Sequence, residues 1–471
     1  MKGIGDHRPL GYSPGVRSRV DAGAPLKAPA IAVEQGRAEL SSPQDSVATF
    51  RAGPLKPQPL SASQKKALVE GYKTSTLRLA QREAIVVGGG PGGLAAAITL
   101  AKMGVKVTVL EARANEAGDK PAHARPHQIS LRQDSLDTLK TLGAYDQVME
   151  KSGFVSKEVH IRARDGEQHH EEKVPEGKSH KPTGIGVINP NSLLTDSVSQ
   201  VRISDIETSL YEQALKHGVE VKSGVQATLT PQAEGNSYSV GIRKVEKDAE
   251  SGYRPMGETT DLGIPDLVVV ADGAGSPTRA ALGIGVREES AAKNYLGGHV
   301  QKGLGAETRK ATVLEPDGSK RHVMGTGHAK YDQTWVSVEI TPDEAKLSPK
   351  ERAQLLADKA QVVMGQEVTT ADIGWGAGQL TTVQNRRAER TTAGDNVVLL
   401  GDSAGTGSVW VGGGLNLALT THLSALKNVM TRIQSGSDRG VAMEIYDKTV
   451  QWATSVWHKA GAAELGPSLQ R

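Results

Sequence analysis

A buried-strand pattern followed by a run of glycines is the feature of this 471-residue chain that most constrains its fold. Residues 84–87 read Ala-Ile-Val-Val and predict a short buried strand, and residues 88–93 read Gly-Gly-Gly-Pro-Gly-Gly, which fits the pattern G-x-G-x-x-G. The alanine-rich residues 94–100 predict a helix, and residues 105–110 predict a second strand. A strand, a glycine turn, a helix and a strand in this order are typical of a dinucleotide-binding unit.

The glycines have separate roles in such a unit. Gly88 permits the tight turn, Gly90 lets the backbone approach a pyrophosphate, and Gly93 lets the helix pack closely on the strand. The helix opens at Pro91 and Gly92, and its first N–H groups and positive end are suited to bind phosphates.

An acidic residue in the expected place supports this interpretation. Glu111 ends the second predicted strand, about 20 residues after the glycines, where an acidic side chain binds a ribose hydroxyl. A glycine-rich structural turn is the alternative, but such a turn does not require two strands, a helix and Glu111. Together these features favour dinucleotide binding.

Composition excludes several other kinds of site. The chain has no cysteine, which excludes disulfides, thiolate-bound metals and a cysteine nucleophile. The net charge is +3 and no basic run carries interleaved aromatic residues, so we expect no nucleic-acid partner. The His-His-Glu-Glu run at 169–172 lies in a polar stretch and is interpreted as a solvated loop, not a metal site.

The same survey gives an expectation for location. No apolar run reaches the roughly 18 residues of a membrane-spanning helix, and residues 1–6 lack the apolar core of a secretory signal. We therefore expect a cytoplasmic protein with no integral membrane span. The Ser- and Pro-rich leader also resembles those of bacterial secreted effectors, which leaves a translocated effector as the alternative.

Two later loops each follow a predicted buried strand. Residues 272–284, Asp-Gly-Ala-Gly-Ser-Pro-Thr-Arg-Ala-Ala-Leu-Gly-Ile, follow the strand 267–271, and residues 401–404, Gly-Asp-Ser-Ala, follow the strand 396–400, with a glycine pattern downstream at 412–416. The three motifs resemble those of the FAD-dependent aromatic hydroxylases, the group A flavoprotein monooxygenases typified by 4-hydroxybenzoate hydroxylase. That family carries G-x-G-x-x-G, then D-G-x-x-S-x-x-R, then G-D-x-A leading to G-x-G-x-N.

The resemblance implies FAD as the cofactor, NAD(P)H as a co-substrate and a small organic substrate. Asp402 would bind a ribityl hydroxyl of FAD, and Asp272 and Arg279 would order a loop near the pyrophosphate. A helix beginning near Leu415 would direct its positive end at the flavin N1–O2 edge. The implied flavin contacts in this stretch are Gly412, Gly414, Leu415 and Asn416.

A more local similarity adds one arginine. The stretch that holds Glu111, Arg125 and Gly143 is similar to kynurenine 3-monooxygenase-like enzymes, in which an arginine contacts FAD. Arg125 is accordingly the candidate in this chain, and a plain surface arginine is the alternative.

The chain departs from the family pattern at three positions. Gly405 stands where the family usually has His, and Val409 stands where a Pro lines the active site. These departures weaken the case for hydroxylation but not for FAD. Near Ile203 the family often has an Arg or Gln that touches FAD, and Arg202, one place earlier, is the candidate substitute.

Four aromatic or apolar residues have two interpretations. Trp410 and Val411, beside the expected flavin loop, either line the substrate pocket or pack on neighbouring strands. Tyr331 and Trp335 are interpreted as sheet residues rather than substrate contacts.

Three functions remain open at this point. The first is an FAD-dependent monooxygenase that uses NAD(P)H and O₂ to hydroxylate or epoxidise a small, aromatic substrate. The second is an FAD-dependent reductase or dehydrogenase on the same fold. The third is a non-catalytic FAD-binding protein, which the leader and its likeness to secreted effectors suggest.

We expect an α/β fold with interleaved domains: a Rossmann-type FAD-binding domain (glutathione-reductase-like, three layers), an inserted β-rich substrate domain and a C-terminal helical segment. The expected parts are a disordered leader (1–62), a helix (63–82), FAD-binding segments (83–155, 201–290 and 386–433), substrate-domain segments (156–200 and 291–385) and a helical segment (434–471). Within them the pattern predicts helices at 135–142, 206–217, 349–364, 415–433 and 440–460, strands at 219–221 and 335–340, and irregular structure over 153–200.

Overall fold

The computed structural model of the chain describes residues 82–113, 128–155, 157–164, 167–173, 199–248, 252–328, 330–374, 378–406 and 413–465. All of them belong to one compact unit, Ser61–Arg471. The expected disordered leader lies outside the described residues, as does the expected helix 63–82 except for its last residue.

A six-stranded sheet forms the centre of the larger hydrophobic core. Its strand order is β20-β21-β12-β1-β2-β8, and all neighbouring strands are parallel except β20 and β21. The strands are β1 (Glu83–Val87), β2 (Lys106–Glu111), β8 (Glu220–Ser223), β12 (Leu267–Val270), β20 (Thr392–Ala393) and β21 (Val397–Leu399). The strands predicted at the three motifs are therefore confirmed.

The strand register decides where the loops emerge. Val87 pairs with Leu110 on one side and with Val270 on the other, and Val270 pairs with Leu399. Four strands therefore end at the same level, and the loops that follow them leave the sheet along one edge.

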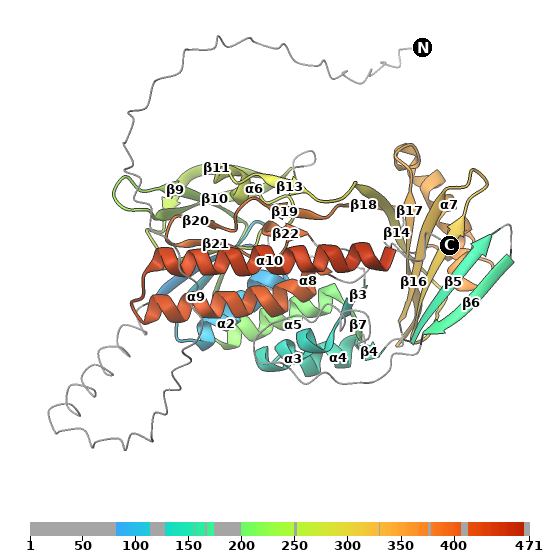
Figure 1. Cartoon of the computed structure of the whole chain (residues 1–471), viewed down its shortest axis with the longest axis horizontal. Coiled ribbons are helices and arrows are strands. Elements are labelled where there is room, and N and C mark those ends of the chain that lie inside the picture. The colour runs from blue at the N-terminus through green and yellow to red at the C-terminus, as the bar shows by residue number, and fades with distance from the viewer. Residues whose placement is uncertain are drawn as a thin grey trace, which may run out of the picture. The chain divides into compact units, whose positions relative to one another are not determined.

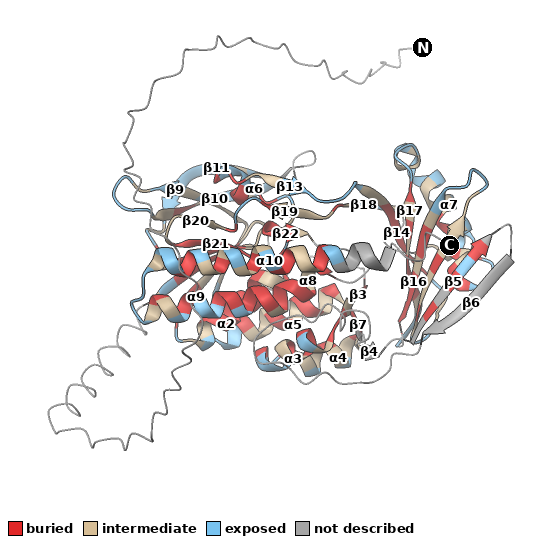
Figure 2. Cartoon of the chain, viewed as in Figure 1, coloured by how far each residue is buried: buried red, intermediate tan, exposed pale blue. Residues whose placement is uncertain are grey.

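Helices cover one face of this sheet. They include α2 (Pro91–Lys102), α5 (Ile203–Lys216), α9 (Leu423–Gln434) and α10 (Arg439–Leu465), while the three-stranded sheet of β9 (Val225–Pro231), β10 (Tyr238–Asp248) and β11 (Gly252–Asp261) lies over the other face (Figure 1). The helices predicted at 206–217 and 440–460 are present with slightly different ends. Figure 2 shows buried residues concentrated where α2, α9 and α10 face one another.

The glycine turn and α2 pack closely because the glycines at their contact have no side chains. Gly88 has φ of +106°, which only glycine adopts without strain, and α2 begins three residues later with Pro91 in its first turn. A Cβ on Gly93 would lie 2.0 Å from the carbonyl oxygen of Gly88, so the first turn of the helix contacts the turn backbone itself.

A seven-stranded sheet forms a second, smaller core. Its order is β18-β14-β17-β16-β15-β5-β6. The strands are β5 (Lys157–Arg164), β6 (Glu167–Lys173), β14 (Lys293–Val300), β15 (Glu307–Leu314), β16 (Lys320–His328), β17 (Tyr331–Ile340) and β18 (Gln379–Val383). One face packs on α7 (Pro349–Met364), whose bounds match the predicted helix and whose first turn is fixed by a capping box of Ser348 and Glu351.

The expectation of irregular structure over 153–200 is wrong for residues 157–164 and 167–173. These residues form β5 and β6, and the run 169–172 lies within β6 instead of a loop. β5 pairs in parallel with β15, and β6 pairs with β5 at the end of the sheet. In β5 the apolar residues Val159, Ile161 and Ala163 alternate with polar residues and are buried, whereas the polar β6 has no such alternation and pairs with β5 through its backbone.

The remaining elements connect the two sheets. They are β3 (Gln128–Leu131), α3 (Gln133–Leu142), α4 (Tyr145–Lys151), β4 (Phe154–Val155), β7 (Ser199–Arg202), α6 (Pro277–Ala281), β13 (Val286–Glu288), η2 (Glu344–Lys346), η3 (Thr370–Asp372), β19 (Arg386–Ala388), η4 (Gly401–Ser403), β22 (Gly405–Thr406), α8 (Gly413–Leu417) and the π-helical turn η6 (Ala418–His422). The helix predicted at 415–433 is present as α8, η6 and α9 in direct succession.

No helix in the described part of the chain is both long enough and apolar enough to cross a lipid bilayer.

The contact between Gly93 and Gly88 predicts a large effect on stability. We expect Gly93→Ala to lower the free energy of unfolding by about 3 kcal/mol, because the new methyl group must displace a backbone carbonyl and α2 with it. Urea unfolding measures this change.

Gly90→Ala is the matched control for that measurement. A Cβ on Gly90 meets nothing nearer than Glu207 Oε1 at 4.0 Å, so we expect a loss of about 1 kcal/mol or less, from the poorer helix cap. Equal stability of the two variants would contradict the close contact at Gly93.

Candidate functional site

A cavity of about 930 Å³ opens between the loop edge of the six-stranded sheet and the face of the seven-stranded sheet opposite α7. Its size lies within the range of ligand and cofactor pockets. Gly90, Asp272 and Asp402, one residue from each of the three motifs, all line it. The parallel sheet thus brings together loops that lie far apart in the chain.

The first loop contributes Gly88, Gly90, Pro91 and Gly92 to the lining. Gly88 fits tightly, since a Cβ there would lie 2.4 Å from the carbonyl oxygen of Ala271. The space at Gly90 is open in comparison, directly before the N-terminus of α2. Gly93 does not line the cavity, and its place is the contact between α2 and the turn.

Glu111 lies in the cavity wall with both carboxylate oxygens engaged. It accepts hydrogen bonds from the backbone N–H of Gly89 at 2.7 Å and from Nε and Nη2 of Arg113 at 2.8 and 3.1 Å. Burial raises the pKa of Glu111, but the hydrogen bonds and charge of Arg113 outweigh it, so the pKa is lowered and the group is an anion at neutral pH. Arg113 also lines the cavity and its Nη1 lies 4.0 Å from Oε1 of the buried Glu207. Sequence reasoning missed Arg113 and Glu207.

The second loop is held in shape by its own side chains. Asp272 lines the cavity and accepts a hydrogen bond from the backbone N–H of Thr278 at 3.1 Å through Oδ2. Arg279 does not line the cavity. Its Nη1 donates to the carbonyl of Ser403 at 3.0 Å and its Nη2 to that of Ala274 at 3.1 Å, which ties the second loop to the third.

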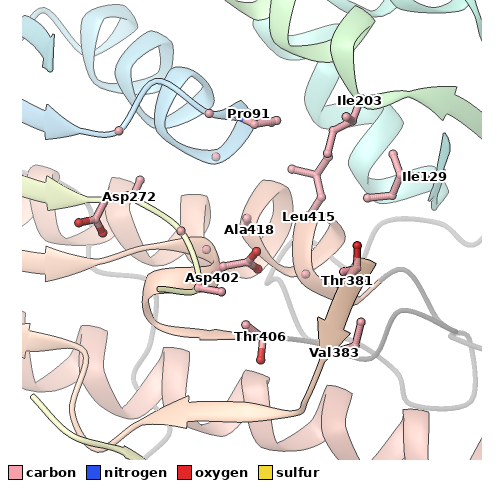
Figure 3. A pocket seen from close by; sticks show the side chains of 18 of the residues that line it. Pro91, Ile129, Ile203, Asp272, Thr381, Val383, Asp402, Thr406, Leu415 and Ala418 are labelled. Atoms are coloured by element: carbon pink, nitrogen blue, oxygen red, sulfur yellow. The ribbon is translucent and has the colours of Figure 1, made fainter. Parts of the chain in front are cut away.

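The third loop is fixed by a buried histidine that sequence reasoning missed. The backbone N–H of Gly401, whose φ is +67°, donates to Nδ1 of His422 at 2.9 Å. Asp402 then lines the cavity beside Gly414, where a Cβ would lie 2.9 Å from Asp402 Oδ1. Figure 3 shows Asp402 between Thr406 and Leu415, with Asp272 on the neighbouring loop.

The start of α8 completes this side of the cavity. Gly413, Gly414 and Leu415 line it, whereas Asn416 does not. The amide of Asn416 is buried and accepts from the backbone N–H of Arg132 at 3.0 Å and from Ser135 Oγ at 2.6 Å, so it holds α3 against α8.

Five residues named from the sequence lie outside the described residues: Arg125, Val409, Trp410, Val411 and Gly412.

Arg202, the candidate substitute for an FAD-contacting Arg or Gln, is not part of the cavity lining. Its guanidinium lies 4.7 Å from the ring centroid of Tyr331, and its Nη2 is 3.5 Å from Gln333 Oε1. Ile203 does line the cavity, and so does Gln200. The side chain of Gln200 can donate hydrogen bonds through its amide nitrogen and accept them through its oxygen, so it can bind the same ligand groups as the family's Arg or Gln.

Gln128 is a further lining residue that no sequence pattern indicated. Its side chain is buried, and neither its Oε1 nor its Nε2 has a hydrogen-bond partner among the described residues. Oδ1 of Asp272 is also buried without such a partner. Buried polar atoms of this kind are costly unless a ligand or water satisfies them, so the cavity fits a ligand with several polar groups.

The seven-stranded sheet supplies the opposite wall. From β14, β16 and β17 come Tyr295, Gly297, Met324, Thr326, Trp335 and Ser337, and from β18 come Gln379, Thr381, Thr382 and Val383. The indole of Trp335 lies directly over Gly297, where a Cβ would be 2.5 Å from Trp335 Cζ2. Trp335 is thus a sheet residue, as expected, and also a wall of the cavity, whereas Tyr331 is half exposed and is not part of the lining.

The departure at Gly405 has a structural cause. Gly405 lies in β22, and a Cβ there would lie 2.9 Å from both the carbonyl oxygen of Arg386 and Cγ2 of Thr454 on α10. The C-terminal helix occupies the space that a histidine side chain would need.

The described residues contain no group of three His, Asp or Glu side chains placed to hold a metal ion.

Comparison with known proteins places the chain among FAD-dependent folds. A family model described as FAD binding domain matches residues 81–442. Searching the curated proteins finds no match by sequence.

Solved structures give the same picture. Tetrameric 2-methyl-3-hydroxypyridine-5-carboxylic acid oxygenase is 17% identical with a TM-score of 0.60, over 82% of this chain and 92% of that one. p-Nitrophenol 4-monooxygenase PnpA from Pseudomonas putida DLL-E4 is 18% identical with a TM-score of 0.60, over 82% and 89%. Tetracycline destructase Tet(51) is 16% identical with a TM-score of 0.53, over 81% and 89%. At these identities the comparison establishes a shared fold.

His422 predicts a pH dependence of stability. Burial lowers its pKa to about 3, so it stays neutral in the folded protein, while the unfolded chain takes up a proton below about pH 6.5. Between pH 3 and pH 6.5 the unfolded state therefore binds more protons than the folded state. As the pH is lowered from 6.5, His422 alone decreases the free energy of unfolding by at most about 1.4 kcal/mol per pH unit.

We expect His422→Gln to show a shallower decline than the unmodified protein in urea unfolding between pH 6.5 and 4.5. A glutamine oxygen can still accept from Gly401, but the side chain does not titrate. The exposed His217→Gln is the control and should leave the slope unchanged. Identical slopes for all three proteins would rule out a neutral, buried His422.

Proposed function

Because the chain belongs to the FAD-binding domain family, we propose that it is an FAD-dependent monooxygenase that uses NAD(P)H and O₂ to hydroxylate or epoxidise a small, aromatic substrate. The observation that carries the proposal is the cavity itself. One wall is made of three loops that suit a dinucleotide, and the facing wall is a sheet with aromatic and neutral side chains.

The loop wall would hold FAD along its length. The N-terminus of α2 at Gly90 and Pro91 would bind the pyrophosphate, and Glu111 would accept a hydrogen bond from the adenosine ribose in place of one of those it accepts from Arg113. Asp402 would bind the ribityl chain, and the helical segment that begins at Gly413 would face the flavin ring. Reduced by NAD(P)H, the cofactor would supply the redox chemistry that activates O₂.

The sheet wall would bind and orient the substrate. Trp335 over Gly297 offers a flat apolar surface, and Thr326, Ser337 and Thr381 offer hydroxyl groups to a polar substituent. These residues would also exclude water from the reacting atoms, which a monooxygenase requires. We assign the six-stranded sheet with its helices and β9–β11 to the Rossmann-type, three-layer FAD domain, and the seven-stranded sheet to the inserted substrate domain.

A reductase or dehydrogenase on the same fold is the second candidate. Gly405 favours it, because this residue packs against Thr454 of α10 at the position where the resembled hydroxylases have a histidine. Oxygen dependence separates the two: a dehydrogenase turns over without O₂ when an artificial acceptor is present.

The first experiment is the visible spectrum of the purified protein, with release and identification of its cofactor. We expect a flavin spectrum and FAD, followed by NAD(P)H oxidation that consumes O₂. Incorporation of ¹⁸O from ¹⁸O₂ into the product of an aromatic substrate panel would establish monooxygenation. A colourless protein that binds no added FAD would indicate the non-catalytic alternative instead.

Gly90→Ala tests the placement of the pyrophosphate. The methyl group has room in the protein alone, yet it would occupy the space before α2 that a phosphate needs. We expect the Kd for FAD to rise about tenfold or more, equivalent to about 1.4 kcal/mol, with the fold retained in circular dichroism. Unchanged FAD affinity in titration calorimetry would place the pyrophosphate elsewhere.

A further inference from the structure

The C-terminal helix α10 is fastened to the edge of the FAD-binding sheet by a series of specific contacts. Tyr446 Oη donates to the carbonyl of Leu399 at 2.7 Å, and Gln451 Nε2 donates to that of Ala388 at 2.7 Å. Asp447 Oδ1 accepts from the backbone N–H of Thr391 at 2.6 Å. These bonds fix the position of α10 along the strands, and Figure 1 shows the helix running beside β20, β21 and β22.

One turn beyond Thr454, the helix places His458 against the end of β22. The ring is buried, with 5% of its surface exposed. Its Nδ1 lies 2.5 Å from Glu289 Oε2, and its Nε2 lies 2.6 Å from the carbonyl oxygen of Thr406. A carbonyl can only accept, and an ionised carboxylate can only accept, so both ring nitrogens must donate. Both hydrogens are present only in the imidazolium form.

Glu289 is the counter-ion of this ring. Burial raises the pKa of Glu289, but His458 and Arg387 outweigh burial and lower it, so the carboxylate is ionised at neutral pH. Arg387 Nη2 lies 2.6 Å from Glu289 Oε1. Arg386 is the other charged side chain at this end of β19, and it is turned toward Gln384, to which its Nε donates at 2.7 Å.

Thr406 connects this contact to the cavity. It lines the cavity together with Gln384 and Arg386, and its hydroxyl accepts from the backbone N–H of Arg386 at 3.0 Å and donates to the carbonyl of Gln384. Asp402, which would bind the ribityl chain, lies in the same loop, residues 401–406. The hydrogen bond from His458 to the Thr406 carbonyl therefore fixes the C-terminal end of that loop. No side chain at Gly405 can do this, because Thr454 and Arg386 leave no room for one.

We propose that His458 is a positioning residue for the cofactor site: held as an imidazolium between Glu289 and the Thr406 carbonyl, it clamps the loop 401–406 in the shape that binds FAD. The inference rests on the proposed FAD site. Of the clamp residues only Thr406 lines the cavity, so His458 acts on the site through the loop backbone.

Two substitutions test the clamp in opposite ways. We expect His458→Leu to raise the Kd for FAD about tenfold, because neither Glu289 nor the Thr406 carbonyl then has its partner. Glu289→Gln should bind FAD more tightly than His458→Leu, because a glutamine amide can donate to Nδ1 of a neutral ring while Nε2 still donates to Thr406. A general loss of packing would not give this rescue.

His217→Gln, which removes an exposed histidine at the C-cap of α5, should leave the Kd for FAD unchanged. A second readout needs no cofactor: ¹⁵N chemical shifts of the His458 ring in the FAD-free protein should show hydrogens on both nitrogens at pH 6.5. A neutral ring at that pH, or a Kd for His458→Leu within about twofold of the unmodified protein, would overturn the proposal. If no variant and no unmodified protein binds FAD, the proposed function fails while the ¹⁵N measurement still decides the clamp.

Discussion

The arrangement of the whole site depends on one contact between backbones. At Gly93 the first turn of α2 packs directly on the carbonyl of Gly88, and Gly88 packs on Ala271, which directly follows β12. Gly88 and Gly93 have no side chains, so the helix, the turn and two parallel strands pack in direct contact. This contact directs the N-terminus of α2 toward the cavity that the other two loops also line.

The parallel sheet explains why three short motifs make one site. Each motif follows a strand, and β1, β12 and β21 end at the same level of the sheet. Arg279 then links the second loop to the third through the carbonyl of Ser403, and His422 fixes the first residue of the third. The loops are thereby positioned relative to one another by side chains that do not themselves reach the cavity.

The sequence was most informative where a local pattern has a single physical cause. Glycines at fixed spacing after a strand predicted the first loop, and the apolar runs predicted β12 and β21, because a strand buried on both faces must be apolar throughout. Strand β6 escaped prediction because its sequence is polar and it forms by backbone pairing with β5, and β5 was missed although Val159, Ile161 and Ala163 alternate along it. Gln128 and His458 also escaped, and so did the place of Trp335 in the cavity wall, because a lone glutamine, histidine or tryptophan carries no pattern and its position depends on residues distant in the chain. Asn416 shows the opposite case, in which a motif residue is used to join α3 to α8.

The two faces of the seven-stranded sheet have different roles: one is buried and stabilises the protein, and the other lines the cavity and would contact a substrate. Its apolar face, with Leu296, Val323 and Val338, is buried against α7 and holds the sheet together. The side chains that alternate with these point the other way, and their contribution to the core is small. Exchanges among them leave the apolar cluster against α7 intact, so descendants of this chain could acquire new substrates through replacements on one side of the sheet while the loops that would bind the cofactor stay unchanged.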